Sequence, residues 1–162
     1  MNFNHFDAAG RAVMVDVSAK QPTRRIAIAE AKVQMKEATF DLIRSGKAAK
    51  GDVLGVARLA GIAAAKKTAE LIPLAHPLSI HAMGIEFEFD EPNSAIIVRG
   101  KATAVERTGV EMEAMVAASV AALTIYDMCK GADRAITIGE IALLFKEGGK
   151  SGIYRRQELK DD

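Results

Sequence analysis

The sequence predicts an α+β sandwich, in which one antiparallel sheet carries helices on one of its faces. Two segments, 52–71 and 108–131, are apolar over most of their length and have the composition of buried helices. The segments between and after them alternate between large apolar residues and small or polar ones, as strands do. Helices that are apolar on nearly every side need cover on nearly every side, so one sheet face alone does not cover them.

The length and composition indicate one domain with its own core, in a chain of 162 residues. A net charge of +1 argues against a general nucleic-acid binder. The single cysteine, Cys129, excludes a disulfide framework within one chain. No uncharged apolar run reaches the roughly 18 residues of a membrane span, and the N-terminus lacks a signal-peptide pattern. We therefore expect a cytoplasmic protein with no membrane association and no nucleic-acid partner.

The chain begins with a segment, 1–20, that has turn-forming residues and no sustained period. We expect a flexible arm that becomes ordered only against something else. After Pro22, the alternation of Ile26 and Ile28 with alanines predicts a strand at 24–35. A short helix is expected at 36–45, and Gly46 should end it.

The helix at 52–71 should begin at Asp52, because an acidic side chain suits the first turn of a helix. Pro73 ends it. Residues 79–90 and 95–106 are expected to form a hairpin around a turn that contains proline and asparagine. The apolar residues of the first of these strands change phase near Gly84, which predicts a bulge there.

The central helix at 108–131 and a further strand at 135–145 complete the domain, which we place at 21–156, before a charged tail at 157–162. The order strand, helices, strand, strand, helix, strand is that of a ferredoxin-like sandwich. The helices would cover one face of the sheet, and the other face would need a partner. We therefore expect the protein to oligomerise through its helices and its sheet.

Acidic residues stand near both ends of the central helix. Thr108 and Glu111 fit a capping-box pattern, so Glu111 either caps the helix or belongs to a site. Glu113 has no such explanation, although an acidic first turn is itself favourable. Asp127 opposes the helix dipole at the other end, which makes it a candidate functional residue. Lys130 could be its catalytic neighbour or simply its ion-pair partner.

The histidines do not form a metal site, because His76 and His81 fall on opposite faces of an extended chain. His76 is either a functional residue or a structurally hydrogen-bonded one. The segment 148–151 is not a phosphate-binding P-loop, because Leu144 stands where that motif needs glycine. Glycine-rich backbone beside lysines can still hold an anion. Basic residues at several element ends would suit a polyphosphate if they converge: Arg24, Arg25, Lys50, Lys130, Lys146 and Lys150.

Several stretches, in this order and spacing, carry a resemblance to one family. They are MVDVS (14–18), TRR (23–25), KGDVLGVARLAGIAAAKKTAELIPL (50–74), HPL (76–78), TGVEMEAM (108–115), YDMCK (126–130) and GGKSG (148–152). Together they resemble the cyclic pyranopterin monophosphate synthases, the C proteins of molybdenum cofactor biosynthesis. The family usually has cysteine just before the histidine, where this chain has Ala75, which argues against a thiol role at that position.

The resemblance implies a lyase that converts 3′,8-cyclo-7,8-dihydroguanosine 5′-triphosphate to cyclic pyranopterin monophosphate and diphosphate, without a cofactor or metal. It also implies a homo-hexamer, a trimer of dimers, with pockets between subunits. The catalytic residues carried over from the family motifs are Lys50, Lys130 and Asp127. The substrate-binding residues are Arg25, Leu74, Ala75, His76, Glu111, Met112, Glu113 and Lys146.

The residue types agree with this chemistry. The two lysines would act as acid and base, because neighbouring cations depress the pKa of a lysine. Arg25, His76 and Lys146 would hold the triphosphate and stabilise the departing diphosphate. The carboxylates would bind the guanine-derived ring or orient the lysines. Two other functions remain open from the sequence, a non-catalytic nucleotide-sensing module of ferredoxin-like fold and a metal-dependent nucleotide hydrolase.

The central helix also constrains how a site could be built. Glu113 and Asp127 are 14 residues apart, which separates them by about 21 Å along a helix and leaves them on nearly the same side. One copy of the helix cannot bring both ends to one reacting ring. Two antiparallel copies across a two-fold axis could, so we expect a site shared between two chains.

Overall fold

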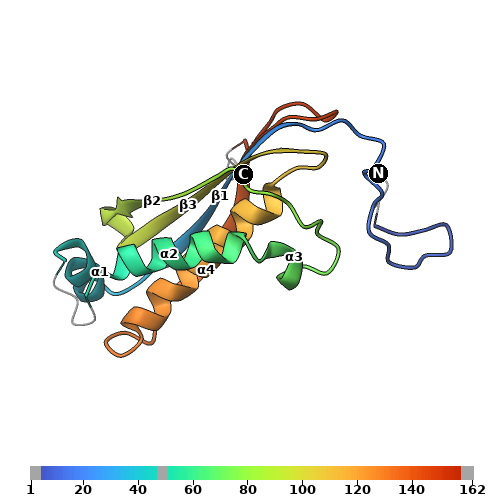
Figure 1. The fold of residues 1–162 in the computed structure, drawn as a ribbon. Coiled ribbons are helices and arrows are strands. Elements are labelled where there is room, and N and C mark those ends of the chain that lie inside the picture. The colour runs from blue at the N-terminus through green and yellow to red at the C-terminus, as the bar shows by residue number, and fades with distance from the viewer. Residues whose placement is uncertain (1–4, 47–50, 158–162) are drawn as a thin grey trace.

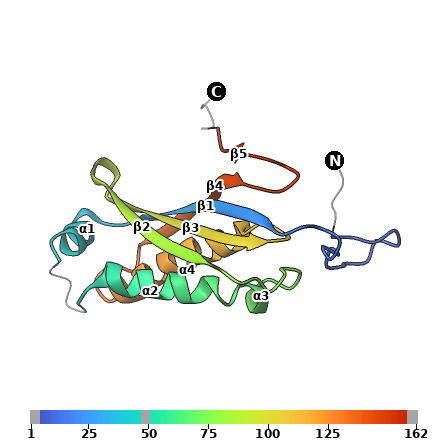
Figure 2. The same ribbon diagram turned by 45° about the horizontal axis from the view of Figure 1, so that its top comes forward.

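The computed structural model describes residues 5–46 and 51–157. The chain forms one antiparallel sheet with the order β2-β3-β1-β4-β5 and with its long helices on one face (Figures 1 and 2). This arrangement confirms the α+β, ferredoxin-like prediction. The elements are β1 (Thr23–Gln34), α1 (Glu37–Arg44), α2 (Val53–Ala65), α3 (Thr68–Leu71), β2 (Ala82–Asp90), the 3-10 turn η1 (Glu91–Asn93), β3 (Ala95–Glu106), α4 (Glu111–Cys129), β4 (Thr137–Glu147) and β5 (Tyr154–Arg155).

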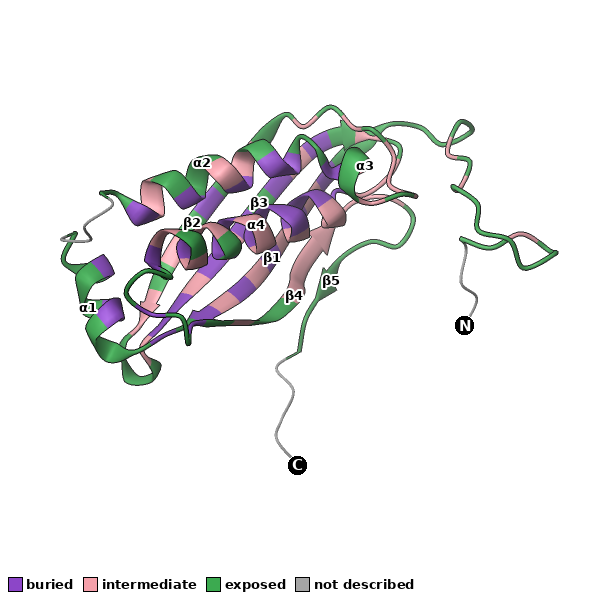
Figure 3. Ribbon diagram, turned by 90° about the horizontal axis from the view of Figure 1, so that it is seen from below, coloured by how far each residue is buried: buried purple, intermediate pink, exposed green. Residues whose placement is uncertain are grey.

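The alternation of the sequence is reproduced in the burial of the strands. In β1 every second residue from Arg25 to Val33 is buried, and the residues between them are partly exposed. In β3, which pairs with β1 along its whole length, Val98, Ala102 and Ala104 are buried on the same face. Figure 3 shows the buried residues of the strands beneath α2 and α4. This face of the sheet is therefore the floor of the core.

The bulge predicted at Gly84 is absent, because β2 pairs with β3 without interruption from Ala82 to Asp90. The strand begins only at Ala82, so Ile80 is not part of its alternation and packs on the core from the preceding loop. The register shifts of the sheet occur instead between β1 and β4, beside Ala29 and Lys32.

The segment predicted as one helix at 52–71 is two helices. Asp52 caps α2 as expected, since its Oδ1 accepts a hydrogen bond from the backbone N–H of Gly55 at 2.8 Å. The chain leaves the α2 axis at Lys66 and Lys67, and α3 follows as a single turn. Thr68 stabilises this break, because its buried hydroxyl donates to the carbonyl of Ala65 at 2.8 Å. The break matters for function, because it carries α3 toward the N-terminal end of α4.

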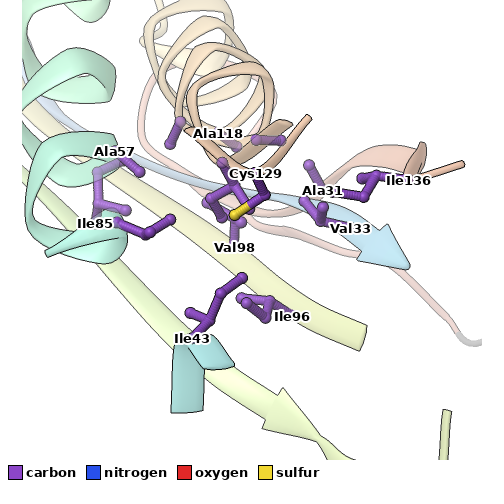
Figure 4. Close-up of a cluster of buried hydrophobic side chains, with 14 of the residues drawn as sticks. Ala31, Val33, Ile43, Ala57, Ile85, Ile96, Val98, Ala118, Cys129 and Ile136 are labelled. Atoms are coloured by element: carbon purple, nitrogen blue, oxygen red, sulfur yellow. The ribbon is translucent and has the colours of Figure 1, made fainter. Parts of the chain in front are cut away.

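The core lies between the sheet, α2 and α4, and its side chains are small where α4 crosses the sheet (Figure 4). Gly100 of β3 lies directly under α4, where an added Cβ would come 2.8 Å from the carbonyl oxygen of Ala114. Gly61 of α2 faces α4 in the same way, with 2.8 Å to the carbonyl oxygen of Ala117. Small residues thus set the close approach of α4 to both neighbours.

We expect the substitution Gly100→Ala to lower the free energy of unfolding by about 1–3 kcal/mol, because the new methyl group overpacks a backbone contact that cannot move freely. Gly84→Ala on the neighbouring strand is the matched control, since nothing lies within 4 Å of its added Cβ. Chemical denaturation of the two variants measures the difference. Equal stabilities would show that α4 does not approach the sheet as closely as described.

The helix α4 is long enough and apolar enough, with a mean hydropathy of 1.3, to cross a membrane. Half of that apolar window is buried inside the fold, against the sheet and α2. Its composition is accounted for by its place as the core helix. On the outer side of the helical layer Leu59 and Leu123 remain exposed, at 70% and 57%.

The face of the sheet away from the helices carries ion pairs. Arg99 of β3 pairs with Glu30 of β1 at 2.8 Å and also with Glu88 of β2. Lys32 lies 3.7 Å from both Asp90 and Glu140. Paired charges therefore share this face with the partly exposed Ile26 and Ile28 of β1, and a partner that covered the face would meet both.

Candidate active site

A cavity of about 590 Å³ opens at the N-terminal end of α4. Its walls are the start of α4, the connection after α3, and the part of the N-terminal arm nearest the sheet. Six residues predicted to bind substrate line it: Leu74, Ala75, His76, Glu111, Met112 and Glu113. The structure therefore gathers into one cavity residues from two stretches more than thirty positions apart.

Glu113 is the most unusual group in this cavity. Its residue is only 3% exposed, and it lies in the first turn of α4. Burial raises the pKa of its carboxyl from 4.5 to about 7; the nearby charge of Glu111 also raises it, while the backbone N–H of Glu113 itself acts in the opposite direction. A carboxyl with a pKa near 7 can both donate and accept a proton at neutral pH.

Glu111 is not part of a capping box. The N-cap of α4 is Val110, and no side chain caps the helix, so the structural explanation considered for Glu111 is wrong. Its carboxylate lies 3.7 Å from Nζ of Lys146 on β4. Lys146 also donates to the hydroxyl of Ser151 in the glycine-rich loop. The pair connects the wall of the cavity to that loop.

The side chain of Arg25 packs against the same glycine-rich loop. Its residue is 9% exposed, and its guanidinium donates from Nε to the carbonyl of Glu106 at 3.2 Å and from Nη2 to that of Arg107 at 3.3 Å. Gly148 and Gly149 pass over it with φ of 108° and 72°, so closely that a Cβ on Gly149 would collide with Nη1. Both the positive φ angles and the close approach to Arg25 require glycine at these two positions. Arg25 thus positions the loop beside Lys146.

His76 contacts the arm. Its Nε2 lies 2.7 Å from the carbonyl oxygen of Val15, and because a carbonyl only accepts, Nε2 carries the proton. Nε2 of His76 therefore makes a structural hydrogen bond, as one of the two interpretations predicted. Nδ1 is the ring nitrogen left for a ligand. The arm contributes His5, Val15, Val17 and Lys20 to the lining of the cavity, and sequence reasoning assigned none of them to the site. Val15 and Val17 belong to the MVDVS stretch of the family resemblance, which was the signal for these two residues.

Asp127 and Lys130 lie at the opposite end of α4. Nζ of Lys130 donates to Oδ1 of Asp127 at 2.5 Å, and both side chains are exposed. This hydrogen bond raises the pKa of Lys130, in contrast to the depressed pKa expected of a lysine base. At 1.5 Å per residue, Asp127 stands about 21 Å and Lys130 about 25 Å from Glu113 along the helix direction. Lys50, the third predicted catalytic residue, lies outside the described residues.

The turn after Lys130 is fixed by Asp133, which sequence reasoning also missed. Its carboxylate is buried and accepts hydrogen bonds from the backbone N–H groups of Lys36 and Ala135, at 2.9 and 3.0 Å. These bonds hold the pKa of Asp133 below its usual value, the bond from Lys36 having the largest effect. The carboxylate joins the end of α4 to the start of α1, so the Lys130 end of the molecule is well anchored.

Comparison with known proteins agrees with this geometry. The MoaC family model matches residues 14–149, which include part of the arm next to the cavity and every element from β1 to β4. The chain is 66% identical to the cyclic pyranopterin monophosphate synthase of Pelobacter propionicus, over 98% of this chain and 99% of the relative. It is 65% identical, with the same coverage, to the enzymes of that name from Geotalea uraniireducens and Geobacter metallireducens. The chain belongs to the MoaC family.

Proposed function

We propose that this chain is a cyclic pyranopterin monophosphate synthase of molybdenum cofactor biosynthesis. It converts 3′,8-cyclo-7,8-dihydroguanosine 5′-triphosphate to cyclic pyranopterin monophosphate with release of diphosphate, and works in the cytoplasm. The observation that carries the proposal is the nearly full-length identity to relatives with that name. The cavity supports it, because it presents proton-transfer groups beside a basic, glycine-rich loop of the kind that binds anions.

The residues of the cavity divide by chemistry. Lys146, the loop that packs on Arg25, and His76 bind the triphosphate and stabilise the diphosphate as it leaves. Glu111 orients Lys146. Glu113, with a pKa of about 7, moves protons while the purine-derived rings open and close again. Leu74, Ala75 and Met112 form the apolar wall against the ring.

Lys130 and Asp127 complete the site from a second chain. The ring chemistry needs its acid and base within hydrogen-bond reach of the same atoms, whereas Lys130 stands about 25 Å from Glu113 along the direction of α4. Two chains related by a two-fold axis, with their α4 helices antiparallel, bring Lys130 of one beside the cavity of the other. There Lys130 meets the basic loop, and nearby cations lower the pKa that Asp127 raises in the single chain.

The assembly is a hexamer made of three such dimers. Exposed Leu59 and Leu123 on the outer side of the helical layer favour association there. We expect sedimentation at micromolar concentration to show one hexameric species. A stable folded monomer under those conditions would contradict both the hexamer and the shared site.

The activity is tested by incubating the purified protein with the cyclised triphosphate and measuring diphosphate and cyclic pterin. Both products should form in equal amounts, with the rate unchanged by a chelator. Binding without products would indicate the nucleotide-sensing module. Release of phosphate or diphosphate without the pterin, lost on chelation, would indicate a metal-dependent hydrolase.

A further inference from the structure

A second cavity lies behind Glu113. It has a volume of about 160 Å³, and its walls come from the end of α2, from α3 and from Pro77 and Leu78. Glu113 and Leu78 line both this rear cavity and the front cavity described above. Glu113 therefore lies between the two spaces.

We propose that Glu113 exchanges its proton with solvent through the rear cavity while substrate fills the front one. The proposal rests on the proposed function, in which Glu113 transfers protons to or from the substrate ring. A single proton transfer to or from the ring leaves Glu113 in the opposite protonation state, and exchange of one proton with water restores it for the next transfer. A nucleotide bound in the front cavity blocks direct exchange of the Glu113 proton with solvent through that cavity.

The rear cavity is suited to water. Its volume accommodates several water molecules. Polar side chains are present to bind them, since Lys66 and Glu70 line the cavity and both residues are exposed at its outer side. The hydroxyl of Thr68 donates to Ala65 and keeps its lone pairs available to accept from water. A short water chain could thus run from the Glu113 carboxyl to solvent between α3 and the end of α2.

The charges around Glu113 favour such a route over a static role. Glu111 lies on the front side and raises the pKa of Glu113 through its negative charge. Lys66 and Glu70, on the rear side, offer a cation and a carboxylate where the proton would leave.

The test fills the rear cavity. Ala69, which lines only this cavity, is replaced by leucine, with Ala69→Val as a milder variant in case the larger side chain disturbs folding. We expect kcat to fall by up to about 10²-fold, the lower part of the range for general acid–base catalysis. The solvent deuterium isotope effect on kcat should rise, because proton exchange becomes rate-limiting, while KM stays unchanged. Ala38→Leu on the exposed side of α1 is the matched control and should leave all three quantities as in the wild type.

Two results overturn the proposal. The first is a folded Ala69→Leu or Ala69→Val enzyme with unchanged kcat and isotope effect. The second is a rise in KM with unchanged kcat, which would mean that the substitution deforms the front cavity. These results differ from failure of the proposed function itself, in which the wild-type protein would form no cyclic pterin. They differ also from a dispensable Glu113, in which Glu113→Gln would keep normal turnover.

Discussion

The Lys130→Ala enzyme should lose turnover by about 10²–10⁴-fold, the contribution of a positioned acid or base. Its fold should be intact, because Lys130 is exposed and its one described ion pair, to Asp127, is a surface pair three residues away on the same helix. Steady-state assays for diphosphate release measure the loss, and thermal unfolding checks the fold. Near-normal turnover would remove Lys130 from the mechanism.

Lys130→Arg separates proton transfer from simple charge. An arginine keeps the positive charge and can pair with Asp127, but it does not give up a proton in a protein. We expect this variant to be as inactive as Lys130→Ala. Recovery of most of the activity with arginine would show that Lys130 only binds phosphate. Lys101→Ala, on the exposed face of β3, is the control for removal of a surface lysine.

Glu113→Gln should also abolish turnover, and it should change how stability depends on pH. The pKa of Glu113 is about 7 in the folded chain and 4.5 as its ordinary value. Below pH 4.5 the carboxyl is neutral in both states and glutamine mimics it. Between pH 4.5 and about 7 the unfolded chain has lost this proton while the folded chain keeps it, so the wild-type protein loses stability relative to the variant; above about pH 7 the difference stays constant.

The difference between those pKa values corresponds to a gross free energy of about 3 kcal/mol. We expect about 1–2 kcal/mol at pH 8, because water in the adjoining cavities screens the carboxylate. Urea denaturation at pH 4 and pH 8 tests this, with the exposed Glu37→Gln on α1 as control. A variant less stable than wild type at pH 8 would show that the charged form of Glu113 is paired rather than merely buried.

The sequence predicted the fold well because alternation and order are local signals. The alternation of Ile26 and Ile28 with alanines located β1, and the two apolar segments located α2 and α4. The errors arose where a local pattern was overruled by its surroundings. Ile80 suggested a bulge although the strand begins after it, and Thr108 suggested a cap although α4 begins after Val110.

The candidate site was predictable only in part. Motif resemblance identified Glu113 and Lys130, and the 14-residue spacing of Glu113 and Asp127 showed that the two ends of the central helix are far apart. No pattern could show that Glu113 would be buried between two cavities, because that depends on the break between α2 and α3. Nor could it show that a carbonyl of the arm would take the Nε2 proton of His76. Both features depend on contacts between segments distant in the sequence.

The shared site is tested most directly by mixing two inactive variants, Glu113→Ala and Lys130→Ala, under conditions in which subunits exchange. In a mixed dimer one site receives Glu113 from one chain and Lys130 from the other, and the second site lacks both. Random exchange of equal amounts therefore predicts recovery of about a quarter of wild-type activity. No recovery, with exchange demonstrated by mass spectrometry of the assemblies, would mean that each chain builds its own site.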